Sequence, residues 1–262
     1  MTDDVPRRGG RPAAGEPLLD RAFRLLGAFD DADGALTLSR LSERSGIPTS
    51  TTLRLAQRLV GLRALERRHD GTYTIGLRML ELAALAPRGH GLRAVALPHL
   101  EELHRVTGHH VQLAVRDGDA AVIIERLTAR DAAPVLYSVG GRVPLCATSL
   151  GHVLLAYAPA PFRNAYLARE HVLEPEGEVI AAAALRSGIA CVRLRGAVQF
   201  TRPLPTPATS VAAPIRDAPD EVVAALSVLG PGPGRISAAL EETVIAAAHA
   251  VSRDLRASRS AA

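Results

Sequence analysis

The sequence contains no lysine, so all 31 of its Lys+Arg positions are arginines. Without lysine the chain cannot form a Schiff base, use a lysine general base or bind phosphate through a P-loop lysine. Arginine stays charged at physiological pH, and its planar guanidinium binds phosphates and carboxylates through paired hydrogen bonds. The positive charges therefore suit the binding of anions and not acid–base chemistry.

Aromatic residues are also scarce, with no Trp, four Tyr and four Phe among 262 residues. Such a chain lacks the stacking side chains with which proteins bind single-stranded nucleic acid. Its 47% hydrophobic content is mainly Ala, Val, Leu and Ile. The length is sufficient for a sizeable core and predicts two modest domains or one large one.

Cys146 and Cys191 are the only cysteines, so neither a disulfide framework nor a zinc pattern is expected. No apolar segment follows Arg7 and Arg8, and no apolar run approaches the ~18 residues that span a membrane. We therefore expect a cytoplasmic protein without a signal peptide, membrane span, metal or cofactor.

Positive charge is concentrated in one short segment. Residues 36–78 contain eight arginines and three acidic residues, whereas residues 1–35 contain five and seven, and the remainder contains 18 and 17. The net charge of +4 therefore arises almost entirely from this segment. Such a segment is typical of a surface that faces phosphates.

The pattern around this segment predicts a winged helix-turn-helix. Apolar spacing indicates a helix over 18–29, and two further helices follow with Ser39 and Thr49 as expected N-caps. Residues 64–68 and 72–75 are expected to form a hairpin, because an Asp-Gly pair favours a tight turn. An all-α packing module, in which the arginines only solvate one face, is the alternative.

The helix with Thr49 as its expected N-cap is predicted to enter the major groove of DNA. Its inward-facing residues are predicted to be Leu53, Ala56, Leu59, Val60 and Leu62. The predicted DNA-binding residues of this helix and of the hairpin are Thr49, Ser50, Thr51, Arg54, Gln57, Arg58, Arg67 and Arg68.

The rest of the chain predicts an α+β domain with a mixed or antiparallel sheet. Helices are expected over 77–87, 92–106, 150–157 and 237–256, and strands over 110–116, 120–127, 135–139, 211–214 and 222–229. The segment 181–195 suits either a helix or a strand. The expected organisation is a disordered arm (1–16), a DNA-binding domain (17–76), a linker helix (77–91), a second domain (92–257) and a tail (258–262).

Four runs carry a resemblance to a known family: LSRLSERSGIPTSTTLRLAQRLVGLRALERR, GTYTIG, VGGRVPLCATSLGHVLLA and SVAAPIRDAPDEVVAALSVLGP. From Leu18 to Leu255 the chain resembles the IclR family of bacterial transcriptional regulators. The resemblance implies a winged helix-turn-helix, a linker helix and a GAF-like effector domain. It also implies a homodimer or dimer of dimers on a pseudo-palindromic operator, modulated by a small organic acid or aromatic effector, with repression as the expected mode.

The resemblance further implies partly interfacial roles for Leu18, Leu25, Met79 and Leu82. Its implied effector-binding residues are Val135, Ser149, Leu150, Phe200, Ser210, Ser227 and Leu229. Phe200 and Arg202 stand where many members have carboxylates, which favours a larger and less polar, or anionic, ligand. Backbone amides at the start of the helix, where the resemblance places Ser149 and Leu150, could hold a carboxylate. Alternatively, Ser149 only caps that helix.

The sequence gives weaker support for catalysis or metal binding than for a DNA-binding regulator. Cys146 and His152 could form a nucleophile and base, but no orienting carboxylate lies nearby in sequence, and we expect His152 at a pocket rim or in solvent. His104, His109 and His110 lack further metal ligands. Arginines in the N-terminal arm could reach a minor groove, although a free tail is the simpler interpretation. The rival to a regulator is a metabolite-binding protein or small-molecule hydrolase whose N-terminal domain only dimerises.

Overall fold

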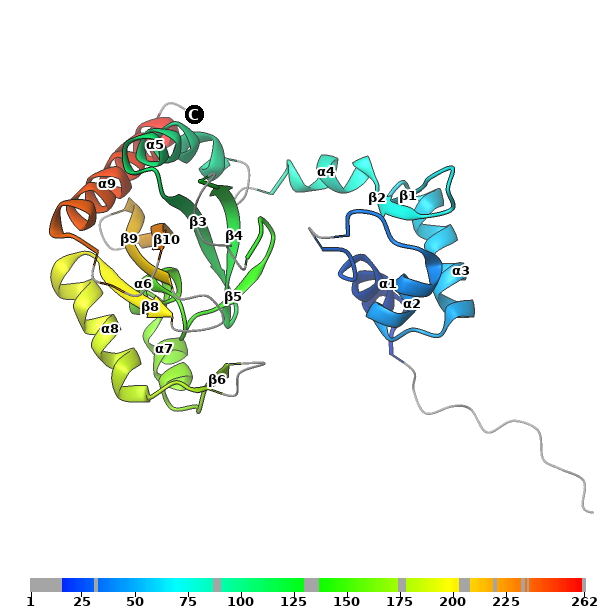
Figure 1. Ribbon diagram of the computed structural model, residues 1–262, viewed down its shortest axis with the longest axis horizontal. Coiled ribbons are helices and arrows are strands. Elements are labelled where there is room, and N and C mark those ends of the chain that lie inside the picture. The colour runs from blue at the N-terminus through cyan, green and yellow to red at the C-terminus, as the bar shows by residue number, and fades with distance from the viewer. Residues whose placement is uncertain are drawn as a thin grey trace, which may run out of the picture. The chain divides into compact units, whose positions relative to one another are not determined.

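A computed structural model describes residues 16–30, 33–86, 91–129, 137–173, 178–202, 208–218, 221–231, 234 and 236–260. The chain forms two compact units, Met1–Leu85 and Ala86–Ala262, and each is described by itself (Figure 1). None of the helices in the described residues is long and apolar enough to cross a membrane.

The N-terminal unit has the predicted order of elements. Three helices are followed by a two-stranded antiparallel hairpin and a fourth helix. They are α1 (Leu18–Leu26), α2 (Leu38–Ser45), α3 (Thr49–Gly61), β1 (Leu65–Arg67), β2 (Tyr73–Ile75) and α4 (Leu77–Ala83). A cluster that includes Leu25, Leu41, Ile47, Leu55 and Tyr73 forms the core between them.

The buried stripe of α3 differs from the prediction. Leu53 and Leu62 are exposed, and the buried residues are Thr52, Leu55, Ala56 and Leu59. Thr52 can occupy the stripe because its hydroxyl donates to the carbonyl oxygens of Ile47 and Pro48, at 3.0 and 3.2 Å. A polar side chain that is satisfied locally thus starts the helical repeat, which apolar spacing alone does not show.

Both predicted N-caps are wrong. Thr37, and not Ser39, caps α2, and its hydroxyl accepts a hydrogen bond from the backbone N–H three residues later. Pro48 occupies the N-cap position of α3 with φ −54°, so the fixed proline ring sets the start of this helix. Thr49 is the first helical residue, and its hydroxyl lies 3.1 Å from that of Ser42.

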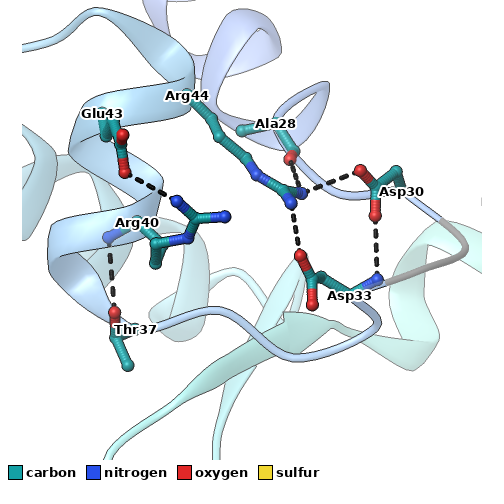
Figure 2. Close-up of polar contacts among 7 residues, drawn as sticks. All are labelled: Ala28, Asp30, Asp33, Thr37, Arg40, Glu43 and Arg44. Carbon is teal, nitrogen blue, oxygen red and sulfur yellow. Dashed lines mark hydrogen bonds and ion pairs between the residues drawn. The ribbon is translucent and has the colours of Figure 1, made fainter.

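Arg44, near the end of α2, ties this helix to the segment that follows α1 (Figure 2). Its guanidinium donates to the carboxylates of Asp30, at 2.9 Å, and Asp33, and to the carbonyl oxygen of Ala28 at 3.2 Å. The guanidinium is therefore paired with two carboxylates of its own unit. Arg44 is therefore a structural arginine, although it lies in the basic segment.

The C-terminal unit is built on a six-stranded sheet in which every pairing is antiparallel. Its order is β5 (Arg142–Pro144), β4 (Ala120–Leu127), β3 (His110–Asp117), β10 (Glu221–Pro231), β9 (Ala208–Ala218) and β8 (Val198–Arg202). A small second sheet pairs β6 (Val172–Leu173) with β7 (Glu178–Val179).

Helices cover both faces of the large sheet (Figure 1). One face packs on α5 (Leu92–Thr107) and α9 (Ala238–Ser260), and the other on α6 (Ser149–Ala156) and α8 (Ala182–Arg195), next to α7 (Ala160–Leu167). Strand alternation supplies both layers, since Val211 and Ala213 belong to the first and Ala212 to the second. The α+β architecture is confirmed.

The strand expected over 135–139 is wrong where the structure describes it. Residues 137–139 have no strand conformation, and Val135 lies outside the described residues. Gly140 turns the chain with φ +84°, and backbone hydrogen bonds from Gly140 and to Gly141 join this turn to Ile123 of β4, whereas strand conformation begins at β5. The ambiguous segment 181–195 contains α8, and β8 was not predicted.

Candidate functional site

The exposed face of α3 is polar and basic around one apolar residue. Ser50, Arg54, Gln57 and Arg58 are exposed, and Thr51 is half-buried. Leu53 lies on the same face with 38% of its surface exposed. Because residues 50, 53, 54 and 57 repeat at helical spacing, they form one continuous surface.

Hydrogen bonds hold the turn before α3 in a defined geometry. Gly46 ends α2 in the left-handed conformation with φ +63°. The hydroxyl of Ser42 then donates to the carbonyl of Ile47 at 2.7 Å, which also accepts from Thr52. The exposed face of α3 therefore has a fixed orientation relative to α2.

The hairpin extends this surface. Arg67 and Arg68 are exposed, and the Arg67 guanidinium lies 5.9 Å from the centre of the buried Tyr73 ring. Gly71 turns the hairpin with φ +83°. The backbone N–H and hydroxyl of Thr72 donate to Asp70, and mainly these hydrogen bonds lower the pKa of that carboxyl group.

Ion pairing divides the eight arginines of the basic segment into two groups of four. The first group forms salt bridges with Asp30, Asp33, Glu43 or Glu81, and consists of Arg40, Arg44, Arg63 and Arg78. The second group forms no salt bridge with any carboxylate in the described residues, and consists of Arg54, Arg58, Arg67 and Arg68. The unpaired positive charge thus lies on α3 and the hairpin.

A small pocket lies between the sheet and the start of α6, and its empty space, with the open solvent at its mouth included, is about 500 Å³. Its residues are Gln112, Ile123, Tyr137, Val143, Ala147, Thr148, Ser149, Leu150, Phe200, Ala208, Ser210, Ser227 and Leu229. Six of the seven effector-binding residues implied by the resemblance are among these, and the seventh, Val135, lies outside the described residues. The side chain of Arg202 is also outside the part of the chain that the structure describes.

Sequence reasoning missed Gln112. A polar residue inside the apolar strand 110–116 was the available signal, but its meaning depends on strand register. Gln112 pairs with Ser227 of β10, and Leu229 pairs with Ser210 of β9. These side chains therefore share the face that forms the pocket floor.

The start of α6 forms the opposite side of the pocket. Thr148 caps this helix by accepting from the N–H of Gly151 at 2.9 Å, so the cap is not Ser149. The Ser149 hydroxyl instead donates to that of Ser210 at 2.7 Å. A Cβ on Gly151 would lie 2.4 Å from the carbonyl oxygen of Leu145, so the helix sits directly on this backbone.

The lining residues in the described part of the chain carry no charged side chain. Hydrogen-bonding capacity comes from the carboxamide of Gln112, from hydroxyls, and from the first backbone N–H groups of α6, which have no intrahelical acceptor. The positive end of the helix dipole adds to this capacity. The pocket can therefore accept a small anion attached to an apolar body.

His152 is 5% exposed and is thus buried, which contradicts the expected rim position. Its Nε2 lies 3.0 Å from the carbonyl oxygen of Cys146, and its ring packs edge-on against Phe200 at 5.3 Å. Burial raises the pKa of the Cys146 thiol and lowers the pKa of His152. The two residues therefore do not form an activated nucleophile.

The rings of His104 and His110 contact the backbone. His104 Nδ1 lies 2.7 Å from the carbonyl of His109, and His110 accepts from the N–H of Ala129 at 3.2 Å. Within the described ranges no group of three His, Cys, Asp or Glu residues could hold a metal.

Known families and proteins resemble the chain along most of its length. Residues 85–257 match the family model for the bacterial transcriptional regulator IclR C-terminal domain, and residues 18–69 match the IclR helix-turn-helix domain. The transcriptional regulator XynR of Escherichia coli K12 is 27% identical over 212 residues, which cover 80% of this chain and 84% of XynR.

Two further proteins are similar to this chain over different shares of its length. KipR of Bacillus subtilis strain 168, also a transcriptional regulator, is 30% identical over 53% of this chain, and the chain spans 56% of the length of KipR. A crystal structure of an IclR homologue from Microbacterium hydrocarbonoxydans, in complex with 4-hydroxybenzoate, has a TM-score of 0.81 at 33% identity. That alignment covers 92% of this chain and 100% of the homologue.

Proposed function

The chain belongs to the IclR family of bacterial transcriptional regulators, and we propose on this premise that it binds double-stranded DNA and a small aromatic carboxylate. Its relatives are transcriptional regulators and not enzymes. DNA binding is assigned to the N-terminal unit and effector binding to the C-terminal unit. Such a regulator acts in the cytoplasm, where its DNA is.

The observation that carries the DNA-binding proposal is the separation of paired from unpaired arginines. Arg54 and Arg58 on α3, with Arg67 and Arg68 on the hairpin, are exposed and form no salt bridge with a described carboxylate. Their charge is available for phosphates, which supply most of the affinity of a protein for DNA. Ser50, Thr51, Arg54 and Gln57 would face base edges in the major groove.

Thr49 lies at the edge of this surface. Its hydroxyl contacts Ser42, so it contributes mainly to the position of α3 and secondarily to DNA contact.

Exposed apolar side chains support a homodimer. Leu18, Leu19 and Phe23 on α1 are exposed, and so are Leu77, Leu80, Leu82 and Leu85 in and after α4. Contiguous exposed apolar side chains mark contact surfaces. Leu25, by contrast, is fully buried in the core of its own unit. A two-fold dimer, alone or as a dimer of dimers, would present two copies of α3 to a pseudo-palindromic operator.

The pocket supports an effector with a carboxylate and one apolar ring. The first backbone N–H groups of α6 suit a carboxylate, and Ile123, Phe200 and Leu229 suit a ring. The homologue crystallised with 4-hydroxybenzoate supports the same class. We propose repression, relieved by the effector, as the mode of action.

Substitution of Arg58 and Arg68 tests the DNA-binding proposal. Each phosphate contact contributes about 0.9 to the slope of log K against log salt concentration, so Arg58→Gln/Arg68→Gln should lower this slope by roughly 2 per protomer. Fluorescence anisotropy with the intergenic DNA upstream of its own gene measures this slope. Arg40→Gln is the matched control, because Arg40 pairs with Glu43.

Equal salt slopes for the double variant and the wild type would contradict the proposed surface. If the wild type does not bind this DNA at all, the N-terminal unit acts only in dimerisation, as the rival hypothesis states.

A thermal-shift series with aromatic and aliphatic carboxylates tests the effector class. Benzoates should raise the unfolding temperature more than acetate or glyoxylate at equal concentration, because only they fill the apolar walls. An equal response to all acids, or none, would contradict an aromatic effector.

A further inference from the structure

Gln112 brings an unused hydrogen-bonding group into the pocket. Its side chain is 7% exposed and lines the pocket, and no group in the described residues forms a hydrogen bond with its carboxamide. Polar groups in largely buried residues usually have a partner, so a carboxamide without one that faces a pocket is a candidate contact for a ligand. The carboxamide, which both donates and accepts, is therefore available to a ligand.

The register places Gln112 on the far side of the pocket from the carboxylate-binding end. Ser210, which bonds Ser149 at the start of α6, lies on β9, whereas Gln112 lies on β3, and β10 separates these strands. Neighbouring strands lie about 4.8 Å apart, and Ser210 lies two residues along β9 from Ala212, which is in register with Gln112 through Ser227, so the two positions are about 12 Å apart at the level of the backbone. This span suits one ring with a polar group on each side.

An arginine that does not line the pocket is the neighbour of Gln112 on the sheet. Arg126 is the cross-strand neighbour of Gln112 on β4, and its guanidinium donates to the carbonyl oxygen of Tyr137 at 2.8 Å. No carboxylate in the described part of the chain forms a salt bridge with Arg126. A ligand oxygen bound at Gln112 would therefore lie on the same strand pair as a positively charged side chain.

We infer that Gln112 is the specificity-determining residue of the effector pocket, and that it binds the oxygen of a hydroxyl or carbonyl substituent opposite the carboxylate. The preferred effectors are then one-ring carboxylates with a second polar group across the ring. This inference rests on the proposed function, in which the pocket binds an aromatic carboxylate.

Isothermal titration of the full chain with benzoate, 4-methylbenzoate and 4-hydroxybenzoate tests this role. The methyl and hydroxyl substituents have similar size, but only the hydroxyl forms hydrogen bonds. The wild type should bind 4-hydroxybenzoate about tenfold more tightly than 4-methylbenzoate, since one buried hydrogen bond is worth about one factor of ten. In Gln112→Met the preference should fall to about twofold, with the affinity for 4-methylbenzoate retained.

Gln199→Met is the matched control. Gln199 lies on β8, and its carboxamide already bonds the carbonyl of Ile236 and the carboxylate of Glu241, at 3.1 and 2.8 Å. This variant should keep the tenfold preference. Gln112→Asn, whose shorter carboxamide stays polar, should give an intermediate preference, and it serves if Gln112→Met does not fold.

The possible results separate the two proposals. An undiminished hydroxyl preference in folded Gln112→Met or Gln112→Asn overturns the role of Gln112 and leaves the aromatic effector in place. Equal affinity of the wild type for 4-methylbenzoate and 4-hydroxybenzoate does the same. If none of the three acids binds the wild type, both the effector class and this inference are wrong.

Discussion

The hydroxyl groups of Ser149 and Ser210 lie 2.7 Å apart and join the first turn of α6 to strand β9. Ser210 also donates to the carbonyl oxygen of Phe200 at 3.3 Å, which continues the chain of hydrogen bonds to β8. The start of α6 is therefore positioned by the same strands that form the pocket floor.

Removal of either hydroxyl should destabilise the C-terminal unit. Ser149→Ala and Ser210→Ala should each cost about 1 kcal/mol of unfolding free energy, because each leaves a buried hydroxyl without this partner. Since both variants break the same bond, the double variant should cost less than the sum, by about 0.5–1.5 kcal/mol. Urea unfolding followed by circular dichroism measures the cycle, and strict additivity would show that the bond does not form.

Leu53 should contact a thymine methyl group in the operator. It is the apolar residue on the exposed face of α3, between Ser50 and Arg54, and apolar side chains read thymine through its methyl group. Replacement of thymine by uracil in the operator should weaken wild-type binding roughly tenfold, and Leu53→Ala binding by less than twofold. Equal losses for the two proteins in gel-shift titrations would contradict the contact.

Arg44 should matter for stability and Arg40 should not. Arg44 is only 23% exposed at its side chain and holds two carboxylates and a carbonyl, whereas Arg40 is exposed and pairs with one residue of its own helix. Arg44→Met should therefore cost about 1–2 kcal/mol of unfolding free energy, and Arg40→Met at most about 0.5 kcal/mol. Chemical denaturation of the two variants measures both values, and similar costs would contradict the assignment.

His152 should make the C-terminal unit sensitive to acid. Burial lowers its pKa below the ordinary value of 6.5, so the folded unit keeps it neutral while the unfolded chain takes up a proton. The resulting stability is complete above pH 6.5 and is lost as the pH falls towards the folded-state pKa, by at most about 1.4 kcal/mol per pH unit.

Denaturation at pH 7.5, 6.0 and 5.0 checks this dependence. His152→Leu cannot take up the proton, so it should lose less stability than the wild type over roughly this range. Parallel losses in the two proteins would show that other groups cause the acid sensitivity.

Sequence patterns predict the elements of this protein well where periodicity is strong. The helix-turn-helix, its hairpin and the strands at 110–116, 120–127 and 222–229 agree with the structure in type and closely in extent. Strand β8 was missed, because its five residues gain their conformation from pairing with β9 and not from a pattern of their own.

The parts of the sites that depend on distant residues could not be predicted. Eight arginines in one segment indicate an anion-binding surface, but Arg44 is removed from it by Asp30 and Asp33, which lie 14 and 11 residues earlier in the chain. In the same way, a glutamine in an apolar strand becomes a pocket residue only through the register of β3 with β10.

Helix α6 is buried at all eight of its residues, from Ser149 at the pocket to Ala156. A helix enclosed in this way cannot fray, so its backbone amides exchange with deuterium only when the surrounding layers open together. A ligand bound at its first turn would therefore slow exchange along the whole helix and in the strands beneath it. The rate of deuterium exchange in α6 and in these strands would thus report whether the pocket is occupied.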